Sequence, residues 1–336
     1  MYDKKMAVKT TTLETSRQLP RPRTRTRWLT HFLLIIVCLI MASPALYALQ
    51  VATLDIRQAL QTPPILFPPG GERESLVEFL RNPVGDLPTN VGVLFGEPDT
   101  NLLLQGNEGE TAPPQAEGNS RHDFGSLISN TTIVSLVVVI GKTILALLAG
   151  LAFVYFRFPG KWVLFFFVLL TLLMPTEIIL QPLRQIMQDL GWRQSNPKLA
   201  LTVPFLASAI GAFLFRQHFS NIPRELAEAA QIDGATSLRF LFSVLIPMSW
   251  NVIVAHALIQ FIYMWNQYIW PTFILLDVTS PEQMIQVGVR NAAFSGQFTD
   301  YGLLMTAGVI ASIPPLVLFL LLQKQFMNGF AITRDK

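Results

Sequence analysis

The chain has 336 residues, of which 51% are hydrophobic and only 14% are charged, and its formal net charge is +3. Soluble domains carry about 25% charged residues, so this composition excludes an ordinary soluble enzyme and favours a membrane protein. Cys38 is the single cysteine, which excludes a disulfide within the chain.

The chain begins with a basic segment, residues 1–28, which holds eight Lys or Arg and two acidic residues. An apolar run at 29–49 follows it and is long enough to cross a bilayer as a helix. Basic flanks of membrane helices stay on the cytoplasmic side, so we expect 1–28 to be a cytoplasmic tail. No clear cleavage pattern follows the run, so we do not expect a signal peptide.

Residues 50–128 form a long acidic segment between the first two apolar runs. It contains four Lys or Arg, eleven Asp or Glu and nine prolines. Its middle, residues 106–119, has the composition of a disordered segment. We predict an external segment here, either a tolerated surface insertion or a docking surface for an external binding protein.

Five further apolar runs follow, at 129–155, 162–183, 199–215, 252–276 and 302–323. They are continuous and lack the two-residue alternation of barrel strands, so they predict helices. With the first run they give an all-α polytopic membrane protein with six transmembrane helices. Six crossings return the C terminus to the cytoplasm, with a five-helix core at 129–326 and a short tail at 327–336.

A polar loop at 223–247 separates the fourth and fifth runs. Pro223 suits a first helical turn, and Glu225 and Glu228 lie near the positive end of the predicted helix. Gly234 then predicts a helix stop, because glycine adopts the left-handed conformation at little cost. Thr236 or Ser237 can cap a second short helix. The pattern predicts a helix, a glycine bend and a second helix on the cytoplasmic surface.

The spacing in this loop is specific. Glu228-Ala229-Ala230, three residues, Gly234, nine residues and then Val244-Leu245-Ile246-Pro247 resembles the EAA loop of the membrane subunits of binding-protein-dependent ABC importers. Val244 and Ile246 stand where that pattern has Ile and Leu. The resemblance implies a type I importer permease fold. It also implies a noncatalytic chain, to which this loop transmits the movement of a separate ATPase. The residues it assigns to ATPase coupling are Glu228, Ala229, Ala230, Gly234, Val244, Ile246 and Pro247.

Three further sequence segments indicate a subfamily of these importers. Residues 213–219 (FLFRQHF), 261–271 (FIYMWNQYIWP) and 173–182 (LMPTEIILQP) are similar to the sn-glycerol-3-phosphate permeases of the UgpE type. The similarity implies a second permease, two ATPase subunits that use ATP-Mg, and an external solute-binding protein in the bacterial inner membrane. It implies no cofactor on this chain. Import of a neutral mono- or oligosaccharide is the alternative, and a membrane receptor or scaffold is a third hypothesis.

Polar residues within the apolar runs are candidates for the substrate path, because polar groups in membrane helices face a protein interior or a water-filled path. They are Asn266, Gln267, Glu177 and Lys142. Hydrogen bonding between helices is an equally good explanation of the same residues. Gly141-Lys142-Thr143 resembles the end of a phosphate-binding loop, but Leu136 replaces its first glycine, so no ATP site is expected. The four histidines are scattered and predict no metal site.

Overall fold

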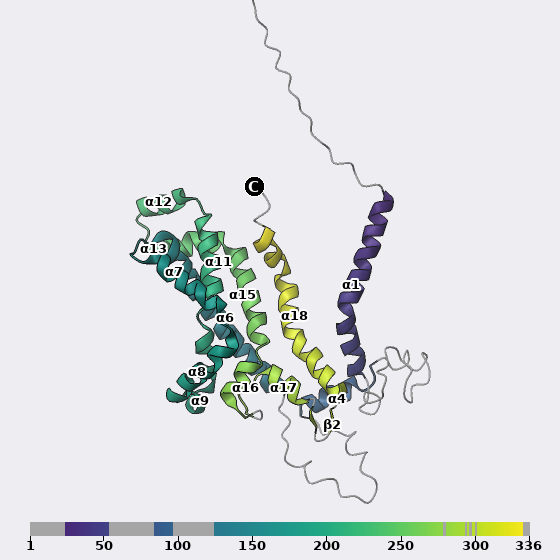
Figure 1. The fold of residues 1–336 in the computed structure, drawn as a ribbon. Helices are drawn as coiled ribbons and strands as arrows, with labels where there is room; N and C mark the ends of the chain where they lie inside the picture. Colours follow the sequence, from purple (N-terminus) through teal and green to yellow (C-terminus); the bar gives the residue numbers. More distant parts are fainter. Residues whose placement is uncertain are drawn as a thin grey trace, which may run out of the picture. The chain divides into compact units, whose positions relative to one another are not determined.

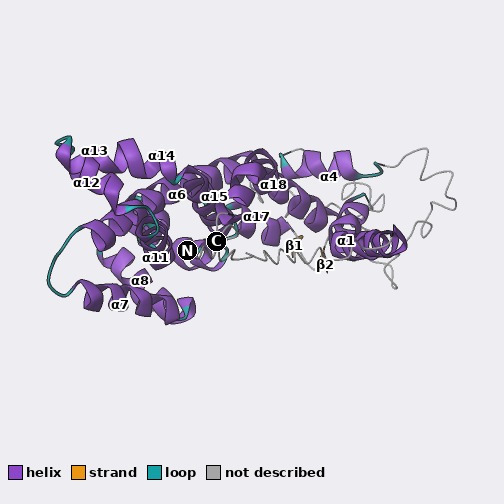
Figure 2. Cartoon of the chain, turned by 90° about the horizontal axis from the view of Figure 1, so that it is seen from above, coloured by secondary structure: helices purple, strands orange, loops and turns teal. Residues whose placement is uncertain are grey.

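A computed structural model describes residues 24–53, 84–96, 124–277, 280–292, 294–295, 298–299 and 301–331. Nearly all of them are helical (Figure 1, Figure 2), as the continuous apolar runs predict. The chain divides into two compact units, Met1–Tyr47 and Ala48–Lys336. Most of the basic tail, most of the acidic segment and residues 332–336 lie outside the described residues.

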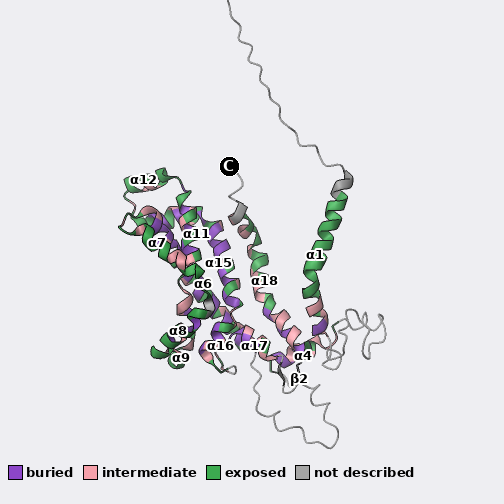
Figure 3. Ribbon diagram, in the orientation of Figure 1, coloured by how far each residue is buried: buried purple, intermediate pink, exposed green. Residues whose placement is uncertain are grey.

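The first unit contains most of helix α1 (Thr24–Ala52), whose last residues belong to the second unit. The segment Trp28–Ala52 is long and apolar enough to cross a membrane, and its most apolar stretch has no buried residue. Figure 3 shows this exposure along the helix. Exposed apolar surface of this extent is typical of a helix that faces lipid or another membrane protein.

Helix α6 (Phe124–Tyr155) is the centre of the second unit. Helices α11 (Ala209–Ser220), α15 (Trp250–Trp265) and α17 (Ile285–Ala292) pack against it, and α15 also packs against α18 (Tyr301–Ala331). At 1.5 Å per residue, the 32 residues of α6 extend about 48 Å, more than the roughly 30 Å of a hydrocarbon core. Both α6 and α18 are long and apolar enough to cross a membrane unaided.

The remaining candidate spans are bent pairs rather than straight helices. Lys161–Leu173 and Ile178–Asp189 meet at 104°, Pro197–Phe205 and Ala209–Ser220 at 40°, and Ser237–Met248 and Trp250–Trp265 at 83°. The described residues therefore contain three candidate spans, or up to six if each bent pair is one span. The six predicted spans thus correspond to three straight helices and up to three bent pairs. Breaks fall inside the predicted spans 162–183, 199–215 and 252–276, the last of them after Trp265.

Two of the breaks have a local cause. Pro175 precedes α8 (Thr176–Asp189), and proline disfavours helical conformation in the residue before it. Ser208 starts α11 as its N-cap, with its side-chain oxygen accepting a hydrogen bond from the Gly211 amide at 3.1 Å. In the fifth run, α15 ends at Trp265 and α16 (Ile269–Leu275) begins after Tyr268.

Short elements complete the second unit. They are α4 (Leu87–Leu94), α7 (Lys161–Leu170), η1 (Thr171–Leu173), α9 (Trp192–Ser195), α10 (Pro197–Thr202) and η2 (Val203–Phe205). A two-stranded antiparallel pair, β1 (Phe294–Ser295) and β2 (Phe298–Thr299), pairs Phe294 with Thr299 and Ser295 with Phe298. The sequence did not predict this pair, because its strands are only two residues long.

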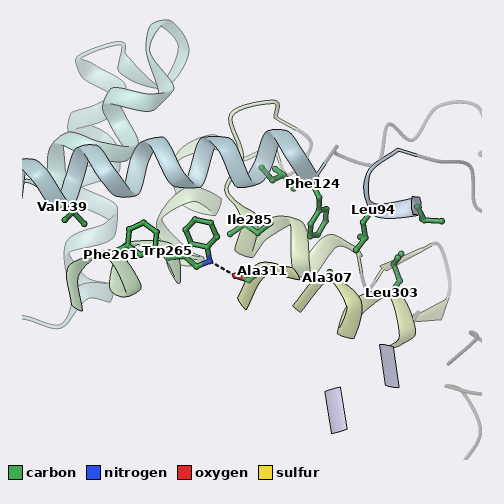
Figure 4. Packing of buried hydrophobic residues seen from close by; sticks show 11 residues of the cluster. Leu94, Phe124, Val139, Phe261, Trp265, Ile285, Leu303, Ala307 and Ala311 are labelled. Carbon is green, nitrogen blue, oxygen red and sulfur yellow. Dashed lines mark hydrogen bonds between the residues drawn. The ribbon is translucent and has the colours of Figure 1, made fainter. Parts of the chain in front are cut away.

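Two buried tryptophans link neighbouring helices by donating indole hydrogen bonds to backbone carbonyls. Trp265 stacks on Phe261 with ring centroids 5.5 Å apart, and its Nε1 donates to the Ala311 carbonyl at 2.9 Å (Figure 4). This contact joins α15 to α18. Trp270 Nε1 donates to the Ala200 carbonyl at 3.2 Å, joining α16 to α10. Satisfying the indole N–H allows these large rings to be fully buried.

Helices α6 and α11 approach closely at two glycines. A Cβ on Gly150 of α6 would lie 2.7 Å from the Phe215 Cβ, and one on Gly211 of α11 would lie 2.7 Å from the Ala146 Cβ. Small residues permit such close packing between membrane helices. The α6–α11 crossing therefore depends on both glycines.

Candidate functional site

The predicted cytoplasmic loop forms a compact helical projection. It consists of α12 (Arg224–Ile232), a bend at Gly234, α13 (Ser237–Phe240), a π-helical turn (Leu241–Leu245) and α14 (Ile246–Met248). In Figure 1, α12 and α13 lie at the same end of the second unit as the C-terminal end of α18. The helices α8, α9, α16 and α17 lie at the opposite end. We call residues 223–247 the coupling loop.

Backbone geometry fixes the bend. Gly234 has φ +70°, and the amide of Ala235 donates to the Ala230 carbonyl at 2.8 Å while the Gly234 amide donates to the Gln231 carbonyl at 3.0 Å. This pair of bonds is a Schellman motif, which ends a helix on a left-handed residue. The Thr236 side chain then accepts from the Arg239 amide at 3.3 Å and caps α13. The local signals read from the sequence therefore operate as expected.

The coupling loop has an anchored face. Ala227, Ala230, Val244 and Ile246 pack against a buried cluster that we call the anchor cluster. Its members come from the loop and from the membrane helices: Ala146, Leu147 and Leu151 of α6; Phe215 and Phe219 of α11; Ile222; Phe240, Leu241 and Leu245 of the loop; Val252 and Ile253 of α15. The loop is thus packed against three long helices at once.

The other face of the loop is exposed. The exposed residues include Glu228, Ala229, Gly234 and Pro247. Of the three residues Glu228-Ala229-Ala230, the first two are therefore exposed, whereas Ala230 packs against the anchor cluster. Four large apolar side chains are also exposed, which sequence reasoning did not single out: Leu226 38%, Ile232 87%, Leu238 55% and Phe242 66%. Exposed apolar groups of this kind are typical of protein contact sites.

Lys142 lies in a buried polar arrangement between helices. Its Nζ donates to Gln260 Oε1 at 2.9 Å and lies 4.8 Å from the ring centroid of Tyr263 and 5.9 Å from that of Phe205. Lys142 is only 6% exposed. The Gly141-Lys142-Thr143 segment lies inside the continuous helix α6, so its amides belong to the helix and form no phosphate-binding loop.

Asn266 and Gln267 lie together where α15 ends. Asn266 is exposed; its Nδ2 donates to the Ile262 carbonyl at 2.9 Å, and its Oδ1 accepts from Gln286 Nε2 at 3.1 Å. Gln267 is half-buried. Close by in sequence, the ring of Tyr268 lies 5.3 Å from the guanidinium of Arg290. These groups come from α15, the following turn and α17.

The structure does not bring all four path candidates together. Asn266, at the end of α15, is six residues from Gln260, which is about 9 Å along a helix axis, so it lies at a different level from Lys142 of α6, which binds Gln260. Glu177 lies in the first turn of α8, and its side chain is outside the described part. In the residues that the structure describes, no group of three or more His, Cys, Asp or Glu is placed to hold a metal ion.

Residues 142–331 match the family described as the binding-protein-dependent transport system inner membrane component. The chain is 37% identical over 213 residues to the sn-glycerol-3-phosphate transport system permease protein UgpE of Pectobacterium atrosepticum, covering 63% of this chain and 74% of the relative. It is 31% identical over 306 residues to the protein of the same name from Shigella flexneri serotype 5b, covering 90% and 96%.

The fold is similar to that in a crystal structure of a bacterial ABC transporter involved in the import of the acidic polysaccharide alginate. The TM-score is 0.67, over 91% of this chain and 99% of that one, at 19% identity. At this identity the likeness shows the fold alone. The family works with a separate ATPase and a binding protein, and its members are noncatalytic membrane subunits. The family match and the two relatives agree: the chain belongs to the family of binding-protein-dependent transport system inner membrane components, as a multi-pass permease subunit of an ABC importer.

Proposed function

We propose that this chain is one of two permease subunits that together conduct sn-glycerol-3-phosphate across the bacterial inner membrane. The second permease is homologous, two ATPase subunits use ATP-Mg, and an external binding protein delivers the solute. The substrate proposal is supported by the two relatives, one of which is 31% identical over 90% of this chain. Both chain termini are cytoplasmic in this proposal.

The coupling loop is the proposed ATPase contact, and one observation carries this proposal. The loop exposes acidic and apolar side chains on one face, while its other face packs into the anchor cluster with α6, α11 and α15. A displacement of the loop therefore moves three membrane helices together, because close-packed interiors transmit strain. ATP-driven closure of the ATPases would pull the loop and open the permease pair outward.

The proposed path includes the amides at the end of α15. Asn266 and Gln267 are uncharged, so they can exchange hydrogen bonds with glycerol hydroxyls without the strength of a charge-assisted pair. Asn266 is exposed and Gln267 half-buried. Glu177 stays a path candidate on the sequence argument alone. Weak, replaceable contacts suit a passage that must release its cargo.

Replacing both amides, Asn266→Leu with Gln267→Leu, should lower the maximal uptake rate about thirtyfold, because two hydrogen bonds of about 1 kcal/mol each are lost. Assembly and basal ATP hydrolysis should be unchanged. Uptake of labelled sn-glycerol-3-phosphate by reconstituted vesicles measures the effect. The control is Gln286→Leu, which removes a neighbour of Asn266 and leaves both amides in place. Undiminished uptake in the double variant would remove both residues from the path.

The proposed orientation is tested by labelling single cysteines in a Cys38→Ser background. Gln194 of α9 and Ser237 of α13 are both exposed and lie at opposite ends of the second unit (Figure 1). Gln194→Cys should react with an impermeant reagent added to intact cells, and Ser237→Cys only after the inner face is opened. The reverse pattern would overturn the charge-based orientation.

The substrate is tested with a solute panel. Vesicles containing this chain, its partner permease, the ATPases and the binding protein should accumulate sn-glycerol-3-phosphate only when ATP is hydrolysed, and should not accumulate glycerol or a neutral disaccharide. Accumulation of the disaccharide alone would refute the substrate and preserve the importer, which is the second hypothesis. A complex that transports nothing while binding an unrelated membrane partner would favour a scaffold.

A further inference from the structure

Helix α15 carries a face with an unusual arrangement of polar groups. Ile259, Tyr263 and Asn266 are exposed at helical spacing, so one side of α15 is not covered by the rest of the described chain. His256, Gln260, Tyr263 and Asn266 follow one another at intervals of three or four residues, about one helical turn each. Polar groups thus occur at four successive levels of a helix that is otherwise apolar.

Lys142 supplies a positive charge to this face. Its ammonium group binds Gln260 and lies against the ring of Tyr263, which is 42% exposed. The ring of Tyr263 therefore separates the Lys142 ammonium group from the uncovered surface of α15. Lys142 is the nineteenth of the 32 residues of α6, so it lies about 27 Å from one end of that helix and about 20 Å from the other. With a hydrocarbon core about 30 Å thick centred on α6, Lys142 lies near the middle of that core, far from the lipid phosphates.

Among the residues that the structure describes, no carboxylate is paired with this ammonium group. The segments that supply its neighbours, α6, α15 and η2, contain no Asp or Glu, and its described partners are an amide oxygen and two aromatic rings. A lysine at the centre of a membrane helix is costly, and a neutral amide compensates less than a carboxylate would. In addition, His256 Nε2 is buried without a hydrogen-bond partner in the described residues. A site with an uncompensated cation and an unsatisfied polar atom is suited to a visiting polar solute.

We infer that Lys142 is a specificity-determining residue of the passage, where its ammonium group pairs with the anionic oxygens of a phosphate monoester at mid-membrane. The inference rests on the proposed role of this chain in conducting a solute, and it names the chemical class that the passage selects. Gln260 holds the ammonium group in place between solutes. Because an amide is a weaker partner than a phosphate dianion, the solute can displace it and leave again.

The test compares three substitutions in the reconstituted complex. Lys142→Met keeps the length of the side chain and removes the charge, whereas Lys142→Arg keeps the charge in a larger group. The double variant Lys142→Met with Gln260→Met also removes the amide that the first change leaves unpaired. Lys324→Met, at an exposed position of α18, is the matched control for loss of one positive charge. Each complex is assayed for sn-glycerol-3-phosphate uptake and for ATP hydrolysis stimulated by loaded binding protein.

If Lys142 acts through its charge, Lys142→Met and the double variant lower the maximal uptake rate about tenfold or more, with stimulated hydrolysis retained. Lys142→Arg and Lys324→Met keep at least half of the wild-type rate. A purely packing role predicts the opposite order, with Arg worse than Met. That order, or wild-type uptake in both Met variants, overturns the inference and leaves the proposed function standing. If the wild type carries a different phosphate monoester and Lys142→Met slows it, the proposed substrate fails and the inference holds, whereas transport of an anion without a phosphate group overturns both. If the wild type carries only a neutral solute, both fail.

Discussion

Gly234→Val should reduce the stimulation of ATP hydrolysis by loaded binding protein about tenfold or more in the purified complex. Gly234 has φ +70°, a conformation that costs a β-branched residue more than the roughly 1–2 kcal/mol paid by other side chains. Valine would therefore break the bend that directs α12 and α13. Nothing lies within 4 Å of a Cβ built at this position, so the effect is conformational and not steric.

That distinction supplies the matched control. Asparagine tolerates the left-handed conformation, so Gly234→Asn should keep most of the stimulation although its side chain is as large as that of valine. Gly160→Val tests a second glycine with φ +74° that lies outside the coupling loop, and it should leave stimulation nearer the wild-type value. Equal activity of the Val and Asn variants at position 234 would show that the bend is not required for coupling.

Gly150→Val should destabilise the chain at the α6–α11 crossing. The added Cβ would lie 2.7 Å from the Phe215 Cβ, 3.0 Å from the Phe215 carbonyl carbon and 3.1 Å from Phe219 Cδ2. Backbone cannot move aside as a flexible side-chain end can, so the helices must separate. Overpacking of this kind costs about 1–3 kcal/mol, and the Tm of the detergent-purified chain should fall by about 5 °C.

The control for this prediction is Gly308→Val in α18, where a built Cβ has nothing within 4 Å. Its Tm should stay within about 1 °C of the wild-type value, because surface changes away from packed contacts are usually small. Gly150 also lies next to the anchor cluster through Phe215 and Phe219. Gly150→Val should for that reason reduce coupled uptake as well. A Tm equal to that of the control would mean that the two helices do not require their close approach.

The sequence predicted the coupling loop well because its determinants are local. The glycine stop at Gly234 lies where it was expected, and the cap of α13 falls on Thr236, one of the two residues expected. Pro223 differs by one position, because it precedes α12 as its N-cap and does not lie in the first helical turn. The spans were predicted less well. A hydropathy run measures how apolar a segment is and does not detect where its helix breaks. Pro175 and the Ser208 cap were visible signals for two of the breaks.

The candidate path was predicted only in part, for a different reason. Lys142 was recognised as a polar group in an apolar run, but its partner Gln260 is 118 residues away. Such a pairing depends on how α6 and α15 pack, which no periodicity in either segment specifies. The same limit applies to the anchor cluster, whose members come from the loop and three membrane helices. The exposed Ile232 and Phe242 were overlooked because apolar residues in a polar loop carry no directional signal until the buried face is known.

In the proposed complex the exposed face of the coupling loop contacts the ATPase, and photo-crosslinking can detect this contact. A photoreactive amino acid at Ile232, which is 87% exposed, is compared with one at Leu173, which is 77% exposed and follows α7 near its break with α8. In the assembled complex we expect an adduct with the ATPase subunit from position 232 and none from position 173. An ATPase adduct from position 173 without one from position 232 would contradict this expectation.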